Sequence, residues 1–355
     1  MCKKKAWLKH KEEIFSASVE ALEEIAKAAQ RNSILKFGKV IGLYTPLYLS
    51  NYCENLCIYC GFHAKANIDR HRLSPEEIVA ELEAIYITGI REVLLLTGEH
   101  ATLTSPLYIA NAAHMARSIG FKSVGVEVYP MSVDEYAMMA SAGVNSLSLY
   151  QETYNRQIYS AVHLDGPKSD YDWRLGAPSR AAQAGIPQIN IGALFGLAPF
   201  EEELFALCDH LSSLMQAFPS VEWGLSIPRL QGATPWVDTS RVPISDIQFI
   251  KIYLTLRRTF PSVTISISTR ESQLMRRHLI TMGINKLSAG VKTTVGGYSN
   301  GDKSDAQFPI RDGQSVVAVT NVISEMGYQP VFTNWFGRGL EFTDSIAHNK
   351  LGANL

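Results

Sequence analysis

The sequence predicts an α/β protein of the (β/α)8, or TIM-barrel, class. Eight short β-rich runs alternate with helical patterns, and a unit in which a helical pattern stops at Gly before an apolar residue occurs six times. Such alternation favours a parallel sheet with crossover helices, and eight repeats favour closure into a barrel. The 355 residues accommodate a barrel of about 250 residues with extensions. A doubly wound open sheet is the alternative.

Helix boundaries are marked by specific residues. Glycine tolerates the left-handed conformation that ends a helix, and the apolar residue after it packs back on the last turn. Capping-box spacing predicts helix starts at Ser74, Ser132 and Ser245, with Pro75 at the first helical position of one helix. The predicted helix exits are Gly89, Gly120, Gly143, Gly185, Gly283 and Gly327.

The predicted strands lie between these helices and define the domain organisation. Residues 1–40 look helical and are expected to pack outside the barrel, residues 41–327 form the barrel, and residues 328–355 form a short C-terminal extension. The eight predicted strands are residues 41–47, 92–96, 123–128, 145–149, 188–195, 222–227, 264–268 and 286–291.

Composition excludes several classes of protein. Hydrophobic residues make up 46% and charged residues 19% of the chain, which indicates a globular protein rather than a disordered one. A net charge of −1 gives no reason to expect nucleic acid or an anionic membrane as partner. No apolar run approaches the roughly 20 residues of a membrane span, and the basic start lacks the apolar stretch of a signal peptide. We therefore expect a cytoplasmic protein.

Three of the five cysteines, Cys53, Cys57 and Cys60, directly follow the first predicted strand. Crowded thiols in a reducing compartment favour a metal centre over disulfides, and a compact loop can hold three corners of an iron–sulfur cubane. Neither Cys2 nor Cys208 is expected to be a fourth ligand, so one iron would stay open for a small molecule. The alternatives are a zinc site with His63 as fourth ligand, or unpaired buried thiols.

The cysteine spacing resembles a known family. The pattern C-x3-C-x-aromatic-C, complete here with Tyr59 before the third cysteine, is the signature of radical S-adenosylmethionine enzymes. Residues 97–100, 150–154, 173–175, 268–272 and 288–292 look like the aromatic amino acid lyase branch of that superfamily. Over nearly the whole chain, the sequence is most similar to the thiamine-pathway tyrosine lyases, the 2-iminoacetate synthases.

This resemblance implies a function and its cofactors. The expected cofactors are a 4Fe-4S cluster and S-adenosyl-L-methionine. The expected reaction cleaves the Cα–Cβ bond of L-tyrosine to 2-iminoacetate and 4-methylphenol for thiazole formation in thiamine biosynthesis. Implied partners are a flavodoxin- or ferredoxin-type electron donor and a thiazole synthase. A tryptophan lyase of the same branch and a non-catalytic electron-transfer protein remain alternatives. The hydrogenase-maturation relative adds a C-terminal cysteine-rich domain, but no cysteine follows Cys208.

The resemblance also implies a set of cofactor-binding residues at the ends of predicted strands, where barrel enzymes place their chemistry. Gly98 and Glu99 would receive the methionine amino group. Glu152 would accept hydrogen bonds from ribose hydroxyls, and Arg174 would pair with the methionine carboxylate, with Arg180 as its rival. The full predicted set is Gly98, Glu99, Glu127, Glu152, Arg174, Gly192 and Leu194, the last two beside adenine.

A second set of residues is predicted to hold the substrate. Arg270, at the predicted end of the seventh strand, is expected to bind the amino acid carboxylate, because a planar guanidinium matches a carboxylate bidentately. Ser288 on the eighth strand and Tyr48 just before the cysteine loop are its predicted polar neighbours. Arg229 is the competing candidate for the carboxylate. The residues of the aromatic pocket are not indicated by the sequence.

Overall fold

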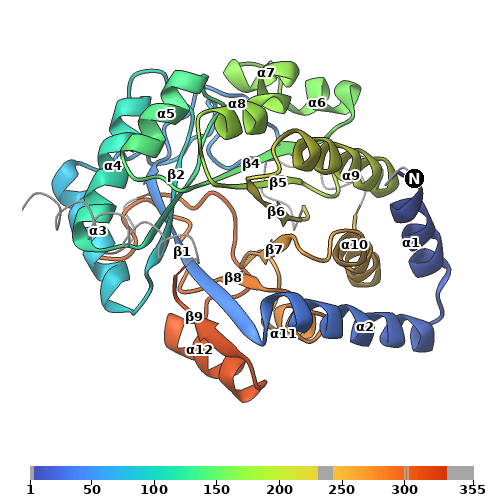
Figure 1. The fold of residues 1–355 in the computed structure, drawn as a ribbon. Helices are drawn as coiled ribbons and strands as arrows, with labels where there is room; N and C mark the ends of the chain where they lie inside the picture. The colour runs from blue at the N-terminus through green and yellow to red at the C-terminus, as the bar shows by residue number, and fades with distance from the viewer. Residues whose placement is uncertain (1–3, 231–242, 300, 302–303, 334–355) are drawn as a thin grey trace, which may run out of the picture.

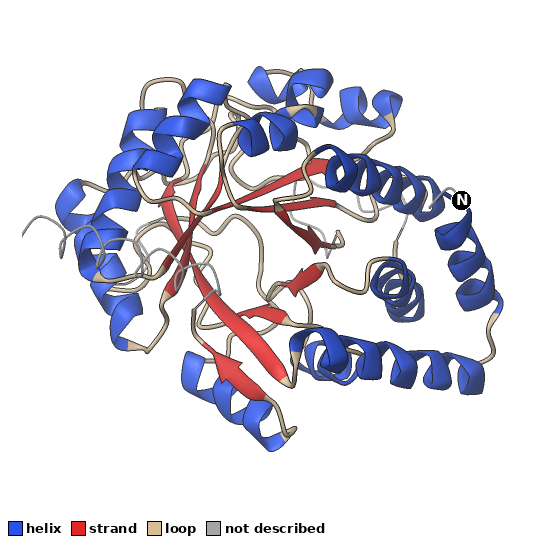
Figure 2. Cartoon of the chain, in the orientation of Figure 1, coloured by secondary structure: helices blue, strands red, loops and turns tan. Residues whose placement is uncertain are grey.

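The computed structural model describes residues 4–230, 243–299, 301 and 304–333. Within this part of the chain, parallel strands close into a barrel with helices around its outside, as Figures 1 and 2 show. The predicted (β/α)8 class is confirmed, and the open sheet is excluded because β1 pairs with both β2 and β8. No helix in these ranges combines the length and apolar character required to cross a membrane.

All eight predicted strands are present, with ends that differ from prediction by up to three residues. They are β1 (Val40–Ser50), β2 (Glu92–Thr97), β3 (Ser123–Glu127), β4 (Ser146–Glu152), β5 (Gln188–Ala193), β6 (Glu222–Ser226), β7 (Thr264–Ile267) and β8 (Lys286–Ser288).

The differences at strand ends move several site residues relative to prediction. Because β1 extends to Ser50, Tyr48 lies inside that strand rather than after it. Glu99 and Arg270 do not end strands as predicted, since β2 stops at Thr97 and β7 at Ile267. After β2 the ladder continues for one more bond, in which Gly98 N–H donates to the carbonyl of Ser50, the last residue of β1, at 3.0 Å.

Helices connect successive strands and cover the outer face of the barrel (Figure 1). The predicted starts at Ser74, Ser132 and Ser245 are capping boxes, and Gly143 adopts a left-handed φ of 99°. The connecting helices are α3 (Pro75–Ile87), α4 (Pro106–Ile119), α5 (Val133–Ser141), α6 (Arg156–Val162), α7 (Tyr171–Leu175), α8 (Ala177–Gln183), α9 (Phe200–Ala217), α10 (Asp246–Thr259), α11 (Gln273–Thr281) and α12 (Val316–Glu325), with a 3-10 turn at Pro167–Ser169.

Residues outside the predicted barrel form two helices and one further strand. Helices α1 (Lys4–Ser16) and α2 (Val19–Phe37) lie along the outside, where Trp7 contacts Phe205 edge-on and Phe15 stacks on Phe200. Strand β9 (Gln329–Val331), which the sequence did not indicate, pairs in parallel with the first residues of β1. This pairing anchors the chain after α12 at the end of the barrel remote from the cysteine loop.

Candidate active site

The cysteine loop follows β1 at the carboxyl ends of the strands. Cys57 is buried, Cys53 and Cys60 are half-buried, and all three are free thiols that line one cavity. Asn55 donates to Cys53 Sγ at 3.7 Å, and Gln307 donates to Cys60 Sγ at the same distance. Amide donors aimed at sulfur favour a thiolate. The structure therefore brings the three predicted ligands together on one wall.

The chemistry of these thiols fits an iron–sulfur cluster. Burial raises the pKa of the Cys57 thiol to about 12 and also raises the pKa of Cys60, so neither is a thiolate on its own. A metal deprotonates a coordinating thiol outright. No group of three or more His, Cys, Asp or Glu residues in the described ranges is gathered to hold a single metal ion. A cubane does not require this, because each thiolate binds a different iron.

A second loop, residues 162–168, packs antiparallel against the cysteine loop. Leu56 N–H donates to the Asp165 carbonyl at 2.9 Å, Ile58 N–H to Val162 at 3.1 Å, and Cys57 forms an isolated bridge with His163. These contacts fix Lys168 at the rim of the cavity. Sequence reasoning missed Lys168, since no motif surrounds it and only the folded chain brings the two loops together.

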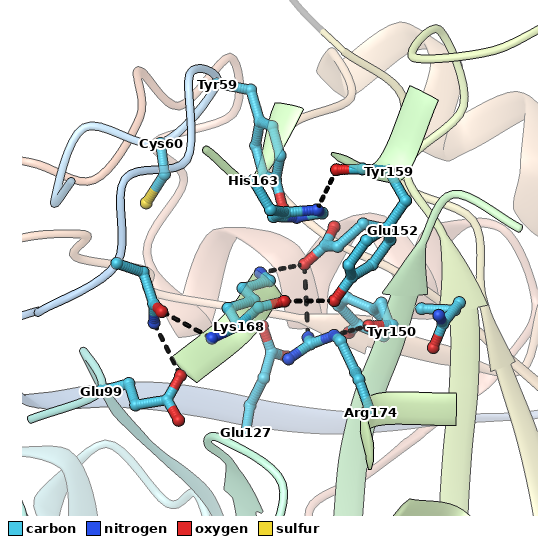
Figure 3. Close-up of polar contacts among 12 residues, drawn as sticks. Tyr59, Cys60, Glu99, Glu127, Tyr150, Glu152, Tyr159, His163, Lys168 and Arg174 are labelled. Carbon is cyan, nitrogen blue, oxygen red and sulfur yellow. Dashed lines mark hydrogen bonds and ion pairs between the residues drawn. The ribbon is translucent and has the colours of Figure 1, made fainter. Parts of the chain in front are cut away.

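Glu152, Lys168 and Arg174 form a buried ionic cluster beside the cysteine loop (Figure 3). Glu152 Oε1 lies 2.7 Å from Lys168 Nζ and 3.4 Å from Arg174 Nη2, and Arg174 Nε donates to the Tyr150 carbonyl at 2.7 Å. Burial raises the pKa of the Glu152 carboxyl, but Lys168 and Arg174 outweigh it and lower the pKa to about 2. Glu152 is therefore ionised at any physiological pH.

The backbone of Glu152 is strained, because it adopts a left-handed conformation. Its φ is 69°, the one left-handed value among non-glycine residues in the described ranges. Such strain costs on the order of 1–3 kcal/mol and persists only where the surroundings impose it. Here the Leu194 N–H bonds the Glu152 carbonyl at 2.8 Å while the side chain turns back to Lys168. The predicted adenine residue Leu194 is thus fixed by the predicted ribose residue.

Gly98 and Glu99 lie in the loop after β2, against the cysteine loop. A Cβ at Gly98 would come within 3.0 Å of Cys53 Cβ and closer still to the Tyr52 carbonyl, so only glycine fits. Glu99 Oε2 accepts from Asn55 at 2.6 Å, and its backbone carbonyl accepts from Glu54 N–H. Burial raises the pKa of Glu99 despite the Asn55 hydrogen bond. Both residues line the cysteine cavity.

Glu127 and Gly192 lie deeper. Glu127 Oε2 accepts from the Tyr150 hydroxyl at 3.0 Å, and burial raises the pKa of Glu127 to about 7 against the opposing effect of this hydrogen bond. A side chain at Gly192 would collide with the Ser226 carbonyl and come within 3.0 Å of the Tyr150 ring. Gly192 therefore gives β5 and β6 their close approach, whether or not adenine lies nearby.

The three predicted substrate residues line a larger neighbouring cavity of about 1080 Å³, open solvent at its mouth included. Arg270 stacks its guanidinium 3.5 Å above the Phe308 ring and has no carboxylate partner in the described part of the chain. Ser288 Oγ is buried without a hydrogen-bond partner among the described residues. The Tyr48 hydroxyl donates to Gln307 Oε1 at 2.8 Å.

The two rival arginines are engaged elsewhere. Arg229 donates to both Glu271 oxygens at 2.8 and 2.6 Å and to Asp246 at 2.6 Å, and it lines neither cavity. Arg180 stacks on Trp173 and donates to the Met131 and Trp173 carbonyls. Their donors are occupied, and among the described residues Arg270 and Arg174 are the arginines that line the two cavities.

The two cavities have eight lining residues in common, so molecules bound in them would lie next to each other. One cavity holds the cysteines and the ionic cluster, and the other holds Arg270 and Ser288. Gln307, missed by sequence reasoning, joins them by donating to Cys60 and accepting from Tyr48. The shared residues are Tyr48, Cys60, Leu96, Glu127, Tyr150, Glu152, Lys168 and Gln307.

Comparisons with known proteins agree with this arrangement. A model described as the radical SAM superfamily matches residues 47–208, and one described as the Biotin and Thiamin Synthesis associated domain matches residues 226–329. The chain is 36% identical over 320 residues to 2-iminoacetate synthase of Salmonella typhimurium, covering 90% of this chain and 84% of that protein. It is 35% identical to the Escherichia coli K12 2-iminoacetate synthase, covering 88% and 83%.

Solved structures resemble the fold closely. The FeFe-hydrogenase maturase HydG of Carboxydothermus hydrogenoformans superposes with a TM-score of 0.86 at 33% identity, covering 93% of this chain and 76% of that chain. Another HydG structure superposes with a TM-score of 0.87 at 29% identity, covering 94% and 78%.

Replacing Cys57 with alanine should abolish iron–sulfur absorbance after anaerobic reconstitution, because two thiolates cannot hold three corners of a cubane. The same is expected for Cys53→Ala and Cys60→Ala. Cys208→Ala is the control, since Cys208 is buried in α9 outside both cavities. Iron and sulfide content per chain gives a second readout. Retention of the full cluster in the Cys57→Ala protein would contradict the assignment of these ligands.

Replacing Glu127 with glutamine should change how stability depends on pH. The folded pKa of about 7 exceeds the ordinary value of 4.5, so the folded protein binds this proton more tightly than the unfolded chain does. The free energy of unfolding therefore falls as pH rises between these values. Glu127→Gln should make that fall shallower in urea unfolding from about pH 5 to pH 7. The exposed Glu201→Gln is the control, and parallel curves for both variants would refute the shift.

Proposed function

The chain belongs to the 2-iminoacetate synthase family of the radical S-adenosylmethionine superfamily, and from this membership we propose that it cleaves the Cα–Cβ bond of L-tyrosine. The products are 2-iminoacetate and 4-methylphenol, which together contain all the atoms of tyrosine. The enzyme is a carbon–carbon lyase that serves thiazole formation in thiamine biosynthesis. Its cofactors are a 4Fe-4S cluster and S-adenosyl-L-methionine.

One cavity suits the cofactors. When bound, the cluster and S-adenosylmethionine would supply radical chemistry for removing a hydrogen atom from the substrate amino group. Cys53, Cys57 and Cys60 would hold the cluster. Arg174 and Lys168 provide two buried cations against the single carboxylate of Glu152, and the surplus positive charge suits the methionine carboxylate.

Further residues around the same cavity complete the proposed cofactor site. Gly98 and Glu99 would receive the methionine amino group, and Glu152 the ribose hydroxyls. Gly192 and Leu194 would lie beside adenine, with Glu127 at the boundary with the substrate. Gly98, Glu99, Glu127 and Glu152 line the cysteine cavity, which supports their assignment, whereas Leu194 lines the substrate cavity and Gly192 lies against Tyr150.

The substrate assignment rests mainly on Arg270, which lines the larger cavity and has no carboxylate partner among the described residues. A guanidinium without a carboxylate partner faces the cavity that adjoins the cysteines, and its stacking on Phe308 fixes the plane of the fork. An α-amino acid carboxylate would satisfy both Arg270 and the unpartnered Ser288 hydroxyl. The Tyr48 hydroxyl stands on the shared wall, where the substrate amino group must meet the radical. Arg270, Ser288 and Tyr48 are therefore the proposed substrate residues.

The partners and the location of the enzyme follow from the same chemistry. The cluster needs a low-potential electron donor of flavodoxin or ferredoxin type. A small imine is readily lost to water, which favours direct transfer from this enzyme to a thiazole synthase. Thiols that must stay reduced favour the cytoplasm. We also infer that residues 41–327 are the catalytic barrel, flanked by residues 1–40 and 328–355.

Product analysis tests the function. Reconstituted enzyme, given S-adenosylmethionine and reductant under anaerobic conditions, should convert tyrosine to 4-methylphenol and glyoxylate, the hydrolysis product of the imine. Tryptophan supplied in parallel should give no indolic product. If the enzyme converted tryptophan but not tyrosine, it would be a tryptophan lyase instead. Cluster reduction without any cleavage of S-adenosylmethionine would instead indicate an electron carrier.

Replacing Arg270 with lysine should uncouple the two halves of the reaction. Lysine keeps the charge but loses the bidentate fork, and a misplacement of about 1 Å can cost on the order of 100-fold in rate. We expect the cluster and S-adenosylmethionine binding to persist while the ratio of 4-methylphenol to 5′-deoxyadenosine falls about tenfold or more. Arg277→Lys, on the exposed face of α11, is the matched control. An unchanged ratio in Arg270→Lys would show that the carboxylate is held elsewhere.

A further inference from the structure

Small and polar residues line much of the interior of the barrel. TIM barrels normally fill the lumen with layers of bulky branched side chains. Here, most residues that line the lower part of the substrate cavity and the space beneath it are small or polar. They include Gly125, Ser146, Ser148, Asn190, Gly224, Ser226, Ser266 and Ser288. A second, smaller space thus adjoins the substrate cavity inside the barrel, with Tyr44, Leu94 and Ser266 lining both, and we call the lower part of the substrate cavity above it the slot.

The slot begins where the substrate carboxylate is proposed to bind. Ser288 is the last residue of β8, and Ser266 pairs with Lys286 two residues earlier on that strand. Two residues of a parallel strand span about 6.6 Å. This length is close to the reach of a tyrosine side chain from Cα to its hydroxyl oxygen. A tyrosine held at Ser288 and Arg270 can therefore place its hydroxyl at the level of Ser266.

The hydroxyl groups of Ser226 and Ser266 are hydrogen-bonded to each other at that level. Ser226 Oγ lies 2.5 Å from Ser266 Oγ and accepts from Asn190 Nδ2 at 2.6 Å. Both serines are buried and line the substrate cavity, and the other contact of Ser266 Oγ, to the Leu225 carbonyl, is long at 3.5 Å. Each hydroxyl has one donor and two acceptor positions. Ser226 also hydrogen-bonds the Tyr150 side chain, so a further polar oxygen would take the place of this contact or of the long contact to the Leu225 carbonyl.

The walls above these serines suit an aromatic ring. Tyr44, Leu94 and Tyr150 line the substrate cavity, and the Tyr150 hydroxyl is already bonded to Glu127. Tyr44 and Leu94 also line the space below, so they face the slot along its depth. Aromatic and aliphatic walls that end in a polar floor match the shape of a phenol, which is apolar along its ring and polar at its tip.

We propose that the aromatic ring of tyrosine enters the barrel lumen and that its hydroxyl bonds to Ser226 and Ser266, which makes these serines the specificity determinants. This inference rests on the proposed function and adds the aromatic pocket to it. The phenol oxygen donates to one serine and accepts from the other, whereas phenylalanine would leave the floor without a partner. A site built to bond a hydroxyl rejects the analogue that lacks it. Indole has one N–H donor and no acceptor, so it can bond to only one of the two serines.

The test measures binding, without turnover, to the reconstituted holoenzyme with S-adenosylmethionine and no reductant. Equilibrium dialysis with tyrosine and with phenylalanine gives the ratio of their affinities. In the unmodified enzyme we expect tyrosine to bind at least about tenfold more tightly. Ser226→Ala and Ser266→Ala, singly and together, should weaken tyrosine binding about tenfold and leave phenylalanine binding nearly unchanged.

Ser146→Ala is the matched control, because Ser146 lines the space below but not the substrate cavity. It should leave the ratio as in the unmodified enzyme. If the unmodified enzyme prefers tyrosine and the double variant keeps that preference, the phenol lies elsewhere and this inference is overturned while the lyase function stands. If the unmodified enzyme binds neither amino acid, the proposed function itself fails. Equal loss of both ligands in the serine variants would indicate a distorted barrel and would also overturn the proposal.

Discussion

The contact between Glu152 and Lys168 ties together the parts of this site that are distant in sequence. Glu152 ends β4, Lys168 belongs to the loop that packs on the cysteine loop, and Arg174 joins them from α7. The Lys168 N–H also bonds to Asn55 Oδ1 at 2.7 Å, within the cysteine loop. Removing one partner of such a buried pair typically costs about 3–5 kcal/mol, because the other charge is left uncompensated. The position of the cysteines therefore depends on a charge pair as well as on the strand that precedes them.

The same charges set the electrostatics of both cavities. Glu152 is held ionised by two cations, while burial raises the pKa of Glu99 and brings that of Glu127 to about 7. The surroundings of these carboxyl groups therefore shift their pKa values in opposite directions, down for Glu152 and up for Glu99 and Glu127. Groups whose surroundings push their pKa values apart are typical of catalytic sites. A cofactor with a cationic sulfur would favour the ionised form of carboxyl groups near it and so oppose the effect of burial on Glu99 and Glu127.

Much of the fold could be predicted because its signals are local. Gly143 ends a helix and Ser132 begins one through contacts within a few residues, and eight β-rich runs that alternate with such helices suffice to predict a barrel. The cysteine ligands could be predicted because they lie close together in the sequence. Lys168 and Gln307 were missed because their partners lie far away in sequence: Lys168 is 113 residues from Asn55, and Gln307 is 247 residues from Cys60. The engagement of Arg229 by Glu271, which separates it from Arg270, was equally invisible until the loops were placed.

A barrel interior lined by small and polar residues loses hydrophobic stabilisation that other parts of the fold must supply. Small residues such as Gly125 and Ser266 bury little apolar surface, so the barrel interior contributes less hydrophobic stabilisation than a packed one. The opposite face of the same strands compensates, since Val124, Ile265 and Leu287 are fully or almost fully buried beneath the helices. Because side chains alternate along a strand, one residue type can specify packing outward while its neighbour keeps the interior free. This alternation lets the barrel hold a substrate within its own axis without losing its core.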